Sequence, residues 1–353
     1  MKHVLPSAVC RLRVFSIVLV VFAVLGVGMV GAEPGRASAE VSMPPDGYGF
    51  AGGSDLLWLS QADLNRELDG VVKTKASWLR VVIDWNSIEP TEGTYNWSTP
   101  DRLINSARAH GLKVLATVVS SPAWSRPAGS FFTAPPTDNG DLSTFLRALI
   151  ARYKANVSNY QIWNEVNLPL FFGGSVDAAR YTSLLKSAYT AVKAAQPGAT
   201  VISAGLARSV GPYSPLSYYT AMYNNGAQGY FDAAAMHPYV FPGGITTNPE
   251  NVISDTVGLR NLMIARGDGA KKIWFTEIGA PTASASPDGV SQVEQAKQIT
   301  DMLWYAANCG FAGPTLIYTI RDSGTSTTDR EQNFGALFTY DWAPKYAASV
   351  LAG

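Results

Sequence analysis

The sequence predicts an α/β protein whose main part is a single (β/α)8 barrel, the TIM-barrel fold. Eight short apolar runs, several rich in β-branched residues, alternate along the chain with segments of helical periodicity. The 353 residues fit one barrel of roughly 250 residues with long loops. A doubly wound open sheet is the alternative, but it calls for a glycine-rich phosphate-binding turn after an early strand. Residues 49–53 are glycine-rich without that spacing, which favours the barrel.

The predicted strands are continuous apolar runs, the pattern of parallel strands buried on both faces. Residues 79–85 show it well, with a single charge, Arg80, among apolar neighbours. In chain order, the eight predicted strands cover residues 48–51, 79–85, 113–119, 159–167, 200–205, 231–239, 272–280 and 314–320.

The predicted helices follow from apolar spacing and from residues that start and stop helices. Pro100 lies just inside one predicted start and Gly111 just past its end. Asp141 is expected to cap the next helix. The predicted helices cover residues 61–76, 99–110, 142–155, 177–195, 216–224, 251–265, 292–307 and 343–351, with long loops at 120–136 and 283–289.

The N-terminal residues have the layout of a secretory signal. Lys2, Arg11 and Arg13 precede an apolar run over residues 14–32, and Ala-Ser-Ala at 37–39 forms a cleavage motif. Because the run is long, an uncleaved membrane anchor is the alternative. Either way, we expect a protein that is secreted or held in the cell envelope.

The chain is therefore divided into residues 1–39, a signal or anchor, and residues 40–353, the barrel domain. The first part holds four of the 27 basic and one of the 27 acidic residues, which leaves 23 against 26, or −3. No basic run suggests a nucleic-acid partner. Only Cys309 remains in the second part, so neither an intramolecular disulfide nor a cysteine-based metal site is expected. Separately, we expect a monomer.

Two carboxylates follow apolar runs that are far apart in the sequence. Glu165 comes after Ile162-Trp163-Asn164, and Glu277 comes after Trp274-Phe275-Thr276. Ordinary salt bridging is the structural alternative for each. In a closed barrel, however, both would lie at the carboxyl-terminal rim. Two facing carboxyls are what glycoside hydrolysis requires, and a separation of about 5–5.5 Å gives retention, whereas about 6.5–9.5 Å gives inversion.

Four neighbours of these acids have roles that their chemistry suggests. Asn164 could bind a sugar hydroxyl. Arg80, which is costly to bury alone, is expected to pair with Glu277 and keep it ionised, unless it is a surface residue at a strand end. His237 and Tyr239 alternate and so face the same side. Tyr239 could donate to the nucleophile, and a satisfied core histidine is the alternative for His237.

These motifs resemble those of the large clan of retaining (β/α)8 glycoside hydrolases. The residues concerned are Arg80, the loop at 87–97, Trp163-Asn164-Glu165, His237-Pro238-Tyr239 and the run at 274–277. The sequence is most similar to glycoside hydrolase family 39 and to cellulase-like bacterial exopolysaccharide endoglycosidases, over residues 47–346. The Asn-Glu pair with a late Glu is fairly specific for the clan and poorly specific for a substrate.

The resemblance implies Glu165 as acid/base, Glu277 as nucleophile and Asn164 as the contact of the sugar 2-hydroxyl, with Arg80, His237 and Tyr239 as supports. Many relatives carry a Trp at the end of strand eight, where this chain has Tyr318. The preferred aromatic platforms for a sugar are Trp85 and Trp124. Further candidates are Phe131, Phe132, Phe171, Phe172, Phe241 and Trp342.

The sequence thus predicts a retaining glycosidase, endo-acting on a β-linked polysaccharide, that needs no cofactor or metal. Two alternatives remain: a catalytically inactive carbohydrate-binding protein of the envelope, and a transglycosylase on the same fold. The stretch at 322–325 is rich in oxygen-bearing side chains but fits no Ca²⁺-binding pattern, and we expect it to be a solvated loop.

Overall fold

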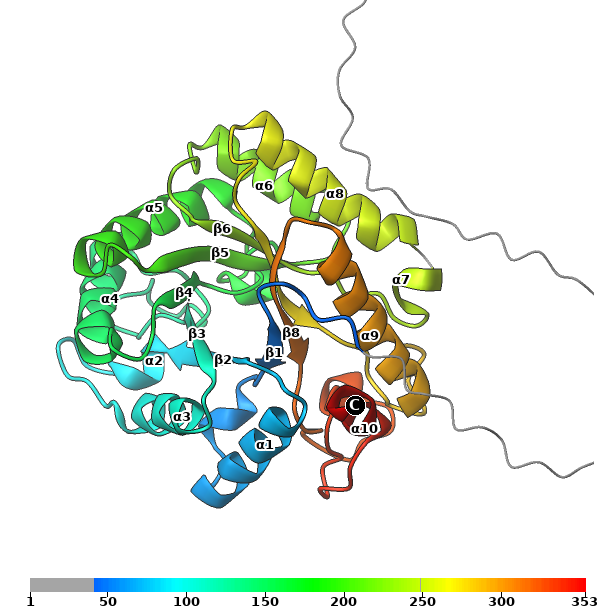
Figure 1. Ribbon diagram of the computed structural model, residues 1–353. Helices are drawn as coiled ribbons and strands as arrows, with labels where there is room; N and C mark the ends of the chain where they lie inside the picture. The colour runs from blue at the N-terminus through cyan, green and yellow to red at the C-terminus, as the bar shows by residue number, and fades with distance from the viewer. Residues whose placement is uncertain (1–40, 248) are drawn as a thin grey trace, which may run out of the picture. The chain divides into compact units, whose positions relative to one another are not determined.

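The fold is a closed ring of eight parallel strands in the order β1 to β8, with β1 also pairing with β8. A computed structural model describes residues 41–353 except residue 248, and in Figure 1 the strands lie inside a ring of helices. The predicted (β/α)8 barrel is confirmed. The strands are β1 (Tyr48–Ala51), β2 (Trp78–Asp84), β3 (Lys113–Val119), β4 (Asn159–Ile162), β5 (Thr200–Ala207), β6 (Ala233–His237), β7 (Ile273–Ile278) and β8 (Ala312–Tyr318).

Helices connect successive strands and cover the outside of the barrel. They are α1 (Gln61–Lys73), α2 (Trp85–Ile88), α3 (Ser98–Ala109), α4 (Asn139–Tyr153), α5 (Ala178–Ala195), α6 (Pro215–Asn224), α7 (Gly244–Thr247), α8 (Pro249–Ala265), α9 (Gln292–Asn308) and α10 (Tyr346–Ala352). Side-chain oxygens cap several of them, as Ser60 does for α1 and Ser291 for α9. The apolar periodicity that predicted these helices therefore marks the faces that they bury against the strands.

Some predicted boundaries were wrong for identifiable reasons. Asp138, not Asp141, caps α4, because its carboxylate accepts from the Gly140 N–H, while Asp141 instead accepts from the Ser125 hydroxyl. The predicted strand at 79–85 ends at Asp84, and Trp85 begins the short helix α2. The last helix begins at Tyr346, three residues later than expected.

The prediction that residues 322–325 form a solvated loop was wrong for Asp322. Asp322 is 5% exposed, and its carboxylate lies 3.1 Å from Nζ of Lys345, whose side chain is fully buried. Lys345 also donates to the Thr282 hydroxyl at 2.7 Å. This buried ion pair ties the segment after β8 to the start of α10 and to the segment after β7, which fixes the chain that follows the last strand.

A small apolar cluster fills the barrel interior, separate from the larger core between strands and helices. Its members come from strands all round the ring, and the indole rings of Trp78 and Trp274 meet edge to face there at 5.2 Å. The cluster consists of Ala51, Trp78, Leu115, Ile202, Ala233, Ala235, Trp274 and Leu316. Side chains two residues further along each strand point the same way and form the next layer.

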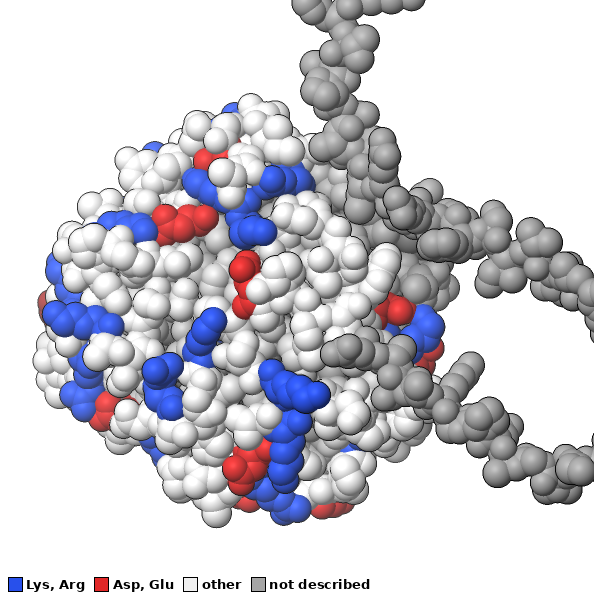
Figure 2. Space-filling model, in the orientation of Figure 1, with Lys and Arg blue, Asp and Glu red and all other residues white. Residues whose placement is uncertain are grey.

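The charges on the face of the molecule drawn in Figure 2 are dispersed. On the face drawn in Figure 2, basic and acidic side chains lie singly or in small groups among uncharged residues. No helix within residues 41–353 is both long and apolar enough to cross a membrane. The predicted signal or anchor, with its apolar run at 14–32, lies outside the described residues, so export stays a prediction.

Candidate active site

A polar layer lies directly above the apolar cluster inside the barrel. Arg80 follows Trp78 by two residues, Thr117 follows Leu115, and His237 follows Ala235. Strand alternation therefore turns these polar side chains inward, toward the carboxyl-terminal mouth of the barrel. In a (β/α)8 barrel this is the end at which active sites are built.

Asn164 and Glu165 both reach this layer although they are neighbours in sequence. In a regular strand, consecutive side chains point to opposite faces. Here β4 ends at Ile162, and Trp163 and Glu165 adopt left-handed backbone angles, with φ of +71° and +45°. The Glu165 N–H donates to the Gly205 carbonyl at 2.9 Å, which holds the distorted segment against β5. Such conformations are unfavourable for residues with a side chain and cluster at functional sites.

Glu277 is held by donors on both carboxylate oxygens. Arg80 Nη1 lies 2.6 Å from Oε1, and the Tyr239 hydroxyl donates to Oε2 at 2.9 Å. Burial alone would raise the pKa of Glu277. The charge that His237 carries when protonated, the charge of Arg80 and the bonds from Tyr239 and Arg80 outweigh burial and lower that pKa. The predicted Arg80–Glu277 pair is confirmed, and it keeps Glu277 ionised.

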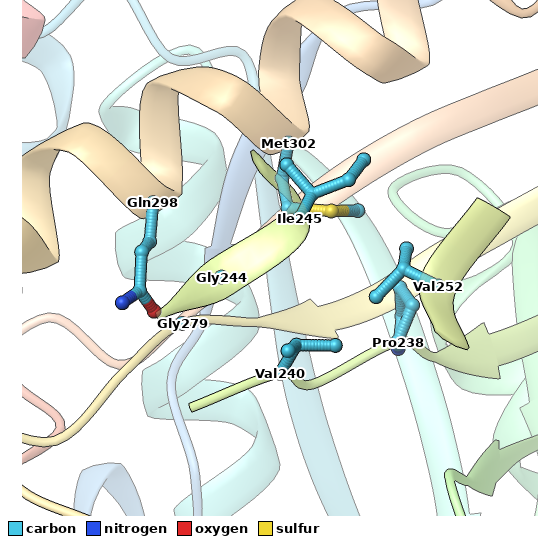
Figure 3. A pocket seen from close by; sticks show the side chains of 8 residues that line it. All are labelled: Pro238, Val240, Gly244, Ile245, Val252, Gly279, Gln298 and Met302. Atoms are coloured by element: carbon cyan, nitrogen blue, oxygen red, sulfur yellow. The ribbon is translucent and has the colours of Figure 1, made fainter. Parts of the chain in front are cut away.

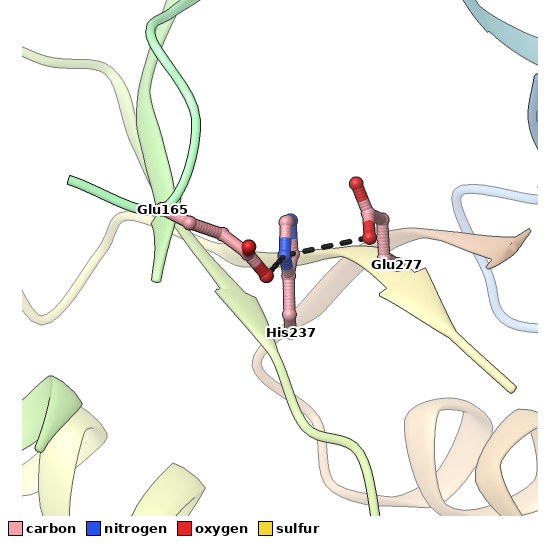
Figure 4. A group of neighbouring side chains, drawn as sticks. All are labelled: Glu165, His237 and Glu277. Carbon is pink, nitrogen blue, oxygen red and sulfur yellow. Dashed lines mark hydrogen bonds and ion pairs between the residues drawn. The ribbon is translucent and has the colours of Figure 1, made fainter. Parts of the chain in front are cut away.

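Glu165 faces Glu277 across the ring of His237. Nδ1 of His237 lies 2.8 Å from Oε1 of Glu165 and 3.6 Å from Oε2 of Glu277 (Figure 4). One oxygen of each glutamate and a ring nitrogen of His237 all lie within 4.8 Å of one another. Asn164 adjoins the group, because its Oδ1 accepts from Arg80 Nη2 at 2.6 Å. Closure of the barrel thus brings together acids that are 112 positions apart in the sequence.

These three side chains are also the group that could supply a metal ion with ligands among the described residues. Their arrangement suits hydrogen bonding better. Arg80 and Tyr239 already occupy the oxygens of Glu277, and the guanidinium places a positive charge 2.6 Å from Oε1, which would repel a cation. The group is therefore better suited to hydrogen bonding than to holding a cation.

Sequence reasoning missed two residues beneath the acids. Gln161 is fully buried and accepts from Arg80 Nε at 2.8 Å, and Thr276 Oγ1 lies 3.0 Å from Nε2 of His237. Gln161 Nε2 also donates to Thr276 Oγ1 at 3.1 Å. The signal that could have revealed them is a hydrogen-bonding side chain inside an otherwise apolar strand, which must find a buried partner.

Gly205 leaves the space in which His237 and Thr276 meet. A Cβ atom at this position would lie 2.1 Å from Nε2 of His237 and 2.6 Å from Oγ1 of Thr276. We expect Gly205→Ala to lower the free energy of unfolding by about 1–3 kcal/mol, as overpacking of a dense core does. Chemical denaturation would measure the change. Gly198→Ala is the matched control, because a Cβ there meets nothing within 4 Å, and an equally small effect of both substitutions would contradict this packing.

Tyr318, the aromatic residue at the end of β8, joins the site through a ring cluster. Its ring lies 5.5 Å from that of Phe334, which in turn lies 5.8 Å from the ring of Tyr239. Burial and the negative charge of Glu277 raise the pKa of the Tyr318 phenol, so it stays a hydrogen-bond donor. Phe334, which was not predicted from the sequence, thus packs between Tyr318 and Tyr239, which were.

Trp85 was wrongly predicted as a sugar platform. It is fully buried, its ring stacks on Phe145 of α4 at 5.4 Å, and its indole N–H donates to Glu89. Trp124 packs edge to face on Trp85 at 5.9 Å but is only half-buried, so it remains a candidate.

The other aromatic candidates divide into core and surface residues. Phe172 is buried, and Trp342 is covered by the guanidinium groups of Arg66 and Arg321 at 4.3 and 4.4 Å. Phe131 and Phe132 are 72% and 54% exposed in the loop between β3 and α4. These two therefore stay candidates for contact with a ligand.

A small pocket lies beside the site, outside the strand wall (Figure 3). It involves residues just after His237 and Glu277, namely Pro238 and Gly279, and the helices α7 and α9. Its lining is Pro238, Val240, Gly244, Ile245, Val252, Gly279, Gln298 and Met302. With one amide and no charged group, this pocket does not offer the acids that the barrel mouth does.

Parts of the sequence are similar to known glycosidases. A family model described as beta-galactosidase (Glyco_hydro_42) matches residues 58–135. Endo-1,4-beta-xylanase C of Paenibacillus barcinonensis is 26% identical over 91 residues, which are 23% of this chain and 8% of that protein. The chain therefore corresponds to a small part of this curated relative.

Several solved structures share the fold. A family 39 glycoside hydrolase from Bacteroides cellulosilyticus WH2 has a TM-score of 0.69 at 21% identity, covering 88% of this chain and 63% of that one. A monomeric beta-xylosidase from Caulobacter crescentus CB15 has 0.66 at 18% identity, covering 89% and 69%. A GH5_18 protein from Streptomyces cattleya, in complex with GlcNAc, has 0.65 at 17% identity, covering 88% and 79%. The resemblance to (β/α)8 glycoside hydrolases, with family 39 among them, is confirmed in fold.

Proposed function

We propose that this protein is a retaining glycoside hydrolase. The observation that carries the proposal is that the carboxyl groups of Glu165 and Glu277 face each other. A carboxyl oxygen of Glu165 lies within 4.8 Å of a carboxyl oxygen of Glu277. This distance favours the short carboxyl separation of retaining enzymes, in which no water fits between the second carboxylate and the sugar. The glycosidase names of the similar proteins support the same class of reaction.

In the first step, a Glu277 oxygen attacks the anomeric carbon while Glu165 gives its proton to the glycosidic oxygen, which leaves as an alcohol. Arg80 and Tyr239 keep Glu277 ionised and oriented before the attack. In the second step, Glu165 takes a proton from water, the water oxygen attacks the same carbon, and the bond to Glu277 breaks. Asn164, fixed by Arg80, is placed to bind the sugar hydroxyl beside the reacting carbon.

The test of this function is the anomeric configuration of the first-formed product. The protein is incubated with a panel of aryl β-glycosides and β-linked polysaccharides, and proton NMR follows the reducing sugar before it mutarotates. We expect the β-anomer to appear first. An α-anomer would overturn the double displacement, and bound glycan without any release would favour an inactive binding protein. Transfer of the sugar to an added alcohol, at the expense of hydrolysis, would favour the transglycosylase.

We further propose that the substrate is a β-linked polysaccharide cut internally. The similar proteins carry β-glycosidase names: beta-galactosidase, endo-1,4-beta-xylanase and beta-xylosidase. The exposed rings of Phe131 and Phe132 on a loop that follows β3 could stack on sugars beyond the cleaved bond. Release of mixed oligosaccharides rather than single sugars would support internal cleavage.

The pH dependence of the reaction follows from the lowered pKa of Glu277. Because the ionised form attacks, the acidic limb of the kcat/KM profile should lie at that low pKa. Tyr239→Phe removes a hydrogen bond to the carboxylate, so the pKa rises and the acidic limb should move to higher pH by about one unit. Tyr340→Phe, a change to an exposed tyrosine, is the control, and an unmoved acidic limb in Tyr239→Phe would contradict the assignment.

A further inference from the structure

A chain of buried hydrogen bonds below the acids has a defined direction, and it begins at Gln161. Its Oε1 lies 2.8 Å from Arg80 Nε and 3.0 Å from Thr117 Oγ1, and its Nε2 lies 3.3 Å from the Ser203 carbonyl. A guanidinium N–H can only donate and a carbonyl can only accept. These two one-way partners fix the amide, with its oxygen toward Arg80 and its NH2 toward Ser203 and Thr276.

Thr276 continues the hydrogen-bond chain in the same direction. It is fully buried, and its oxygen accepts from Gln161 Nε2 at 3.1 Å. The partner described for its own proton within residues 41–353 is Nε2 of His237, at 3.0 Å. If Nε2 carried a hydrogen, that hydrogen would point at the same oxygen and leave the buried hydroxyl proton without an acceptor, which is unfavourable. The hydroxyl therefore donates, and Nε2 accepts.

The other side of the ring requires the complementary arrangement. Nδ1 of His237 lies 2.8 Å from a carboxyl oxygen of Glu165 and 3.6 Å from one of Glu277. Because Nε2 accepts, a neutral ring carries its hydrogen on Nδ1, which donates to these oxygens. Gly205 leaves the room for the bond between Thr276 and His237, because any side chain there would occupy that space. Both ring nitrogens thus point to one tautomer.

We propose that Gln161, acting through Thr276, is a positioning residue that holds His237 as the neutral Nδ1–H tautomer and so reserves Oε2 of Glu165 for the transferable proton. Because Nδ1–H donates to Oε1 of Glu165, the acid carries its proton on Oε2. That proton moves from Oε2 to the leaving oxygen in the first step, and a proton from water restores it in the second. This kinetic consequence rests on the proposed function, whereas the tautomer does not.

The charged and titratable groups that face the ring are few. Glu165 comes from the end of β4, Glu277 from β7 and Tyr239 from the residues after β6, with its ring 6.3 Å from the imidazole. Arg80 of β2 lies on the other side of Glu277. With a neutral imidazole, Arg80 and Tyr239 are the groups that act against burial to favour the ionised form of Glu277, and protonation of His237 would lower the pKa of Glu277 further.

The decisive experiment reverses the chain with Gln161→Glu. A carboxylate at position 161 can only accept, so the Thr276 hydroxyl turns toward it and its oxygen becomes an acceptor for Nε2–H. Two-bond proton–nitrogen NMR on histidine-labelled protein at neutral pH reads both ring nitrogens, and His3→Gln and His110→Gln assign the signals. We expect Nδ1–H with bare Nε2 in the unmodified protein. In Gln161→Glu we expect hydrogens on both ring nitrogens, because Nδ1 still faces the oxygens of Glu165 and Glu277. The basic limb of kcat/KM should then move to lower pH by about one unit, because a charged imidazole favours ionised Glu165.

Three controls keep the test decisive. In Gln161→Glu combined with Thr276→Val, the reversal should vanish, because the connecting hydroxyl is gone. Thr276→Ser, which keeps a hydroxyl, should behave like the unmodified protein. If Gln161→Glu does not fold, Thr276→Val alone should shift the Nε2 resonance and Thr276→Ser should not.

The possible results separate clearly. A protonated Nε2 in the unmodified protein, or an unchanged ring in folded Gln161→Glu, would overturn the tautomer assignment. The expected ring signals with an unmoved pH profile would overturn its part in catalysis. Expected ring signals in a protein without glycosidase activity would leave the tautomer standing and refute the proposed function alone.

Discussion

Glu277→Gln should lower kcat/KM by roughly 10⁴-fold or more, because the variant lacks the anion that attacks the anomeric carbon. The amide oxygen can still accept from Arg80, so the fold should persist. Hydrolysis of aryl β-glycosides, with unfolding monitored by circular dichroism, would measure both effects. Asp69→Asn on α1 is the matched control, since its carboxylate is 64% exposed and pairs with His110.

Chemical rescue makes this result specific. In Glu277→Ala, azide can enter the space of the lost carboxylate beside Arg80 and attack directly. The product should be a glycosyl azide of inverted anomeric configuration. Retained activity in Glu277→Gln, or rescue that yields the uninverted azide, would show that another group is the nucleophile.

Glu165→Ala should show a loss that depends on the leaving group. A poor leaving group such as a sugar needs the proton, so kcat/KM on an oligosaccharide should fall by about 10²–10⁴-fold. A dinitrophenyl glycoside leaves without protonation, so its first step should be nearly unaffected and the glycosyl-enzyme should accumulate. Stopped-flow release of the phenol would show a burst followed by slow turnover. Equal losses on both substrates would contradict a proton-donating role.

The order of strands and helices was predictable because it depends on local patterns. Apolar runs and helix-capping residues act over a few positions, and right-handed connection of parallel strands leaves few ways to arrange eight such units. The facing of Glu165 and Glu277 then followed from closure of the ring. The pairing of Arg80 with Glu277 followed from the cost of burying a charge alone.

The finer structure of the site depended on backbone details that a periodic pattern does not contain. That Asn164 and Glu165 both turn inward follows from the left-handed angles at Trp163 and Glu165. Gly205 ended a predicted strand, whereas β5 continues through it to Ala207, and its missing side chain makes room for His237. Neither effect changes the apolar spacing from which strands are predicted.

Aromatic residues at strand ends were the weakest predictions, because exposure is set by partners far along the chain. Trp85 looks like a rim residue in the sequence, yet Phe145, sixty positions later, covers its ring. The prediction for Asp322 was wrong for the same reason, since its partner Lys345 lies beyond a long intervening segment. Gln161 and Thr276 were missed although a polar residue inside an apolar strand is itself a signal.

The bond between Arg80 and Glu277 spans 197 positions, and this separation has a practical use. A backbone cut between Asn225 and Gly226, at the turn after α6, would leave Arg80, Asn164 and Glu165 on one fragment and His237, Tyr239 and Glu277 on the other. Each fragment alone would be inactive, so turnover after mixing the two fragments would show that they had associated and rebuilt the barrel.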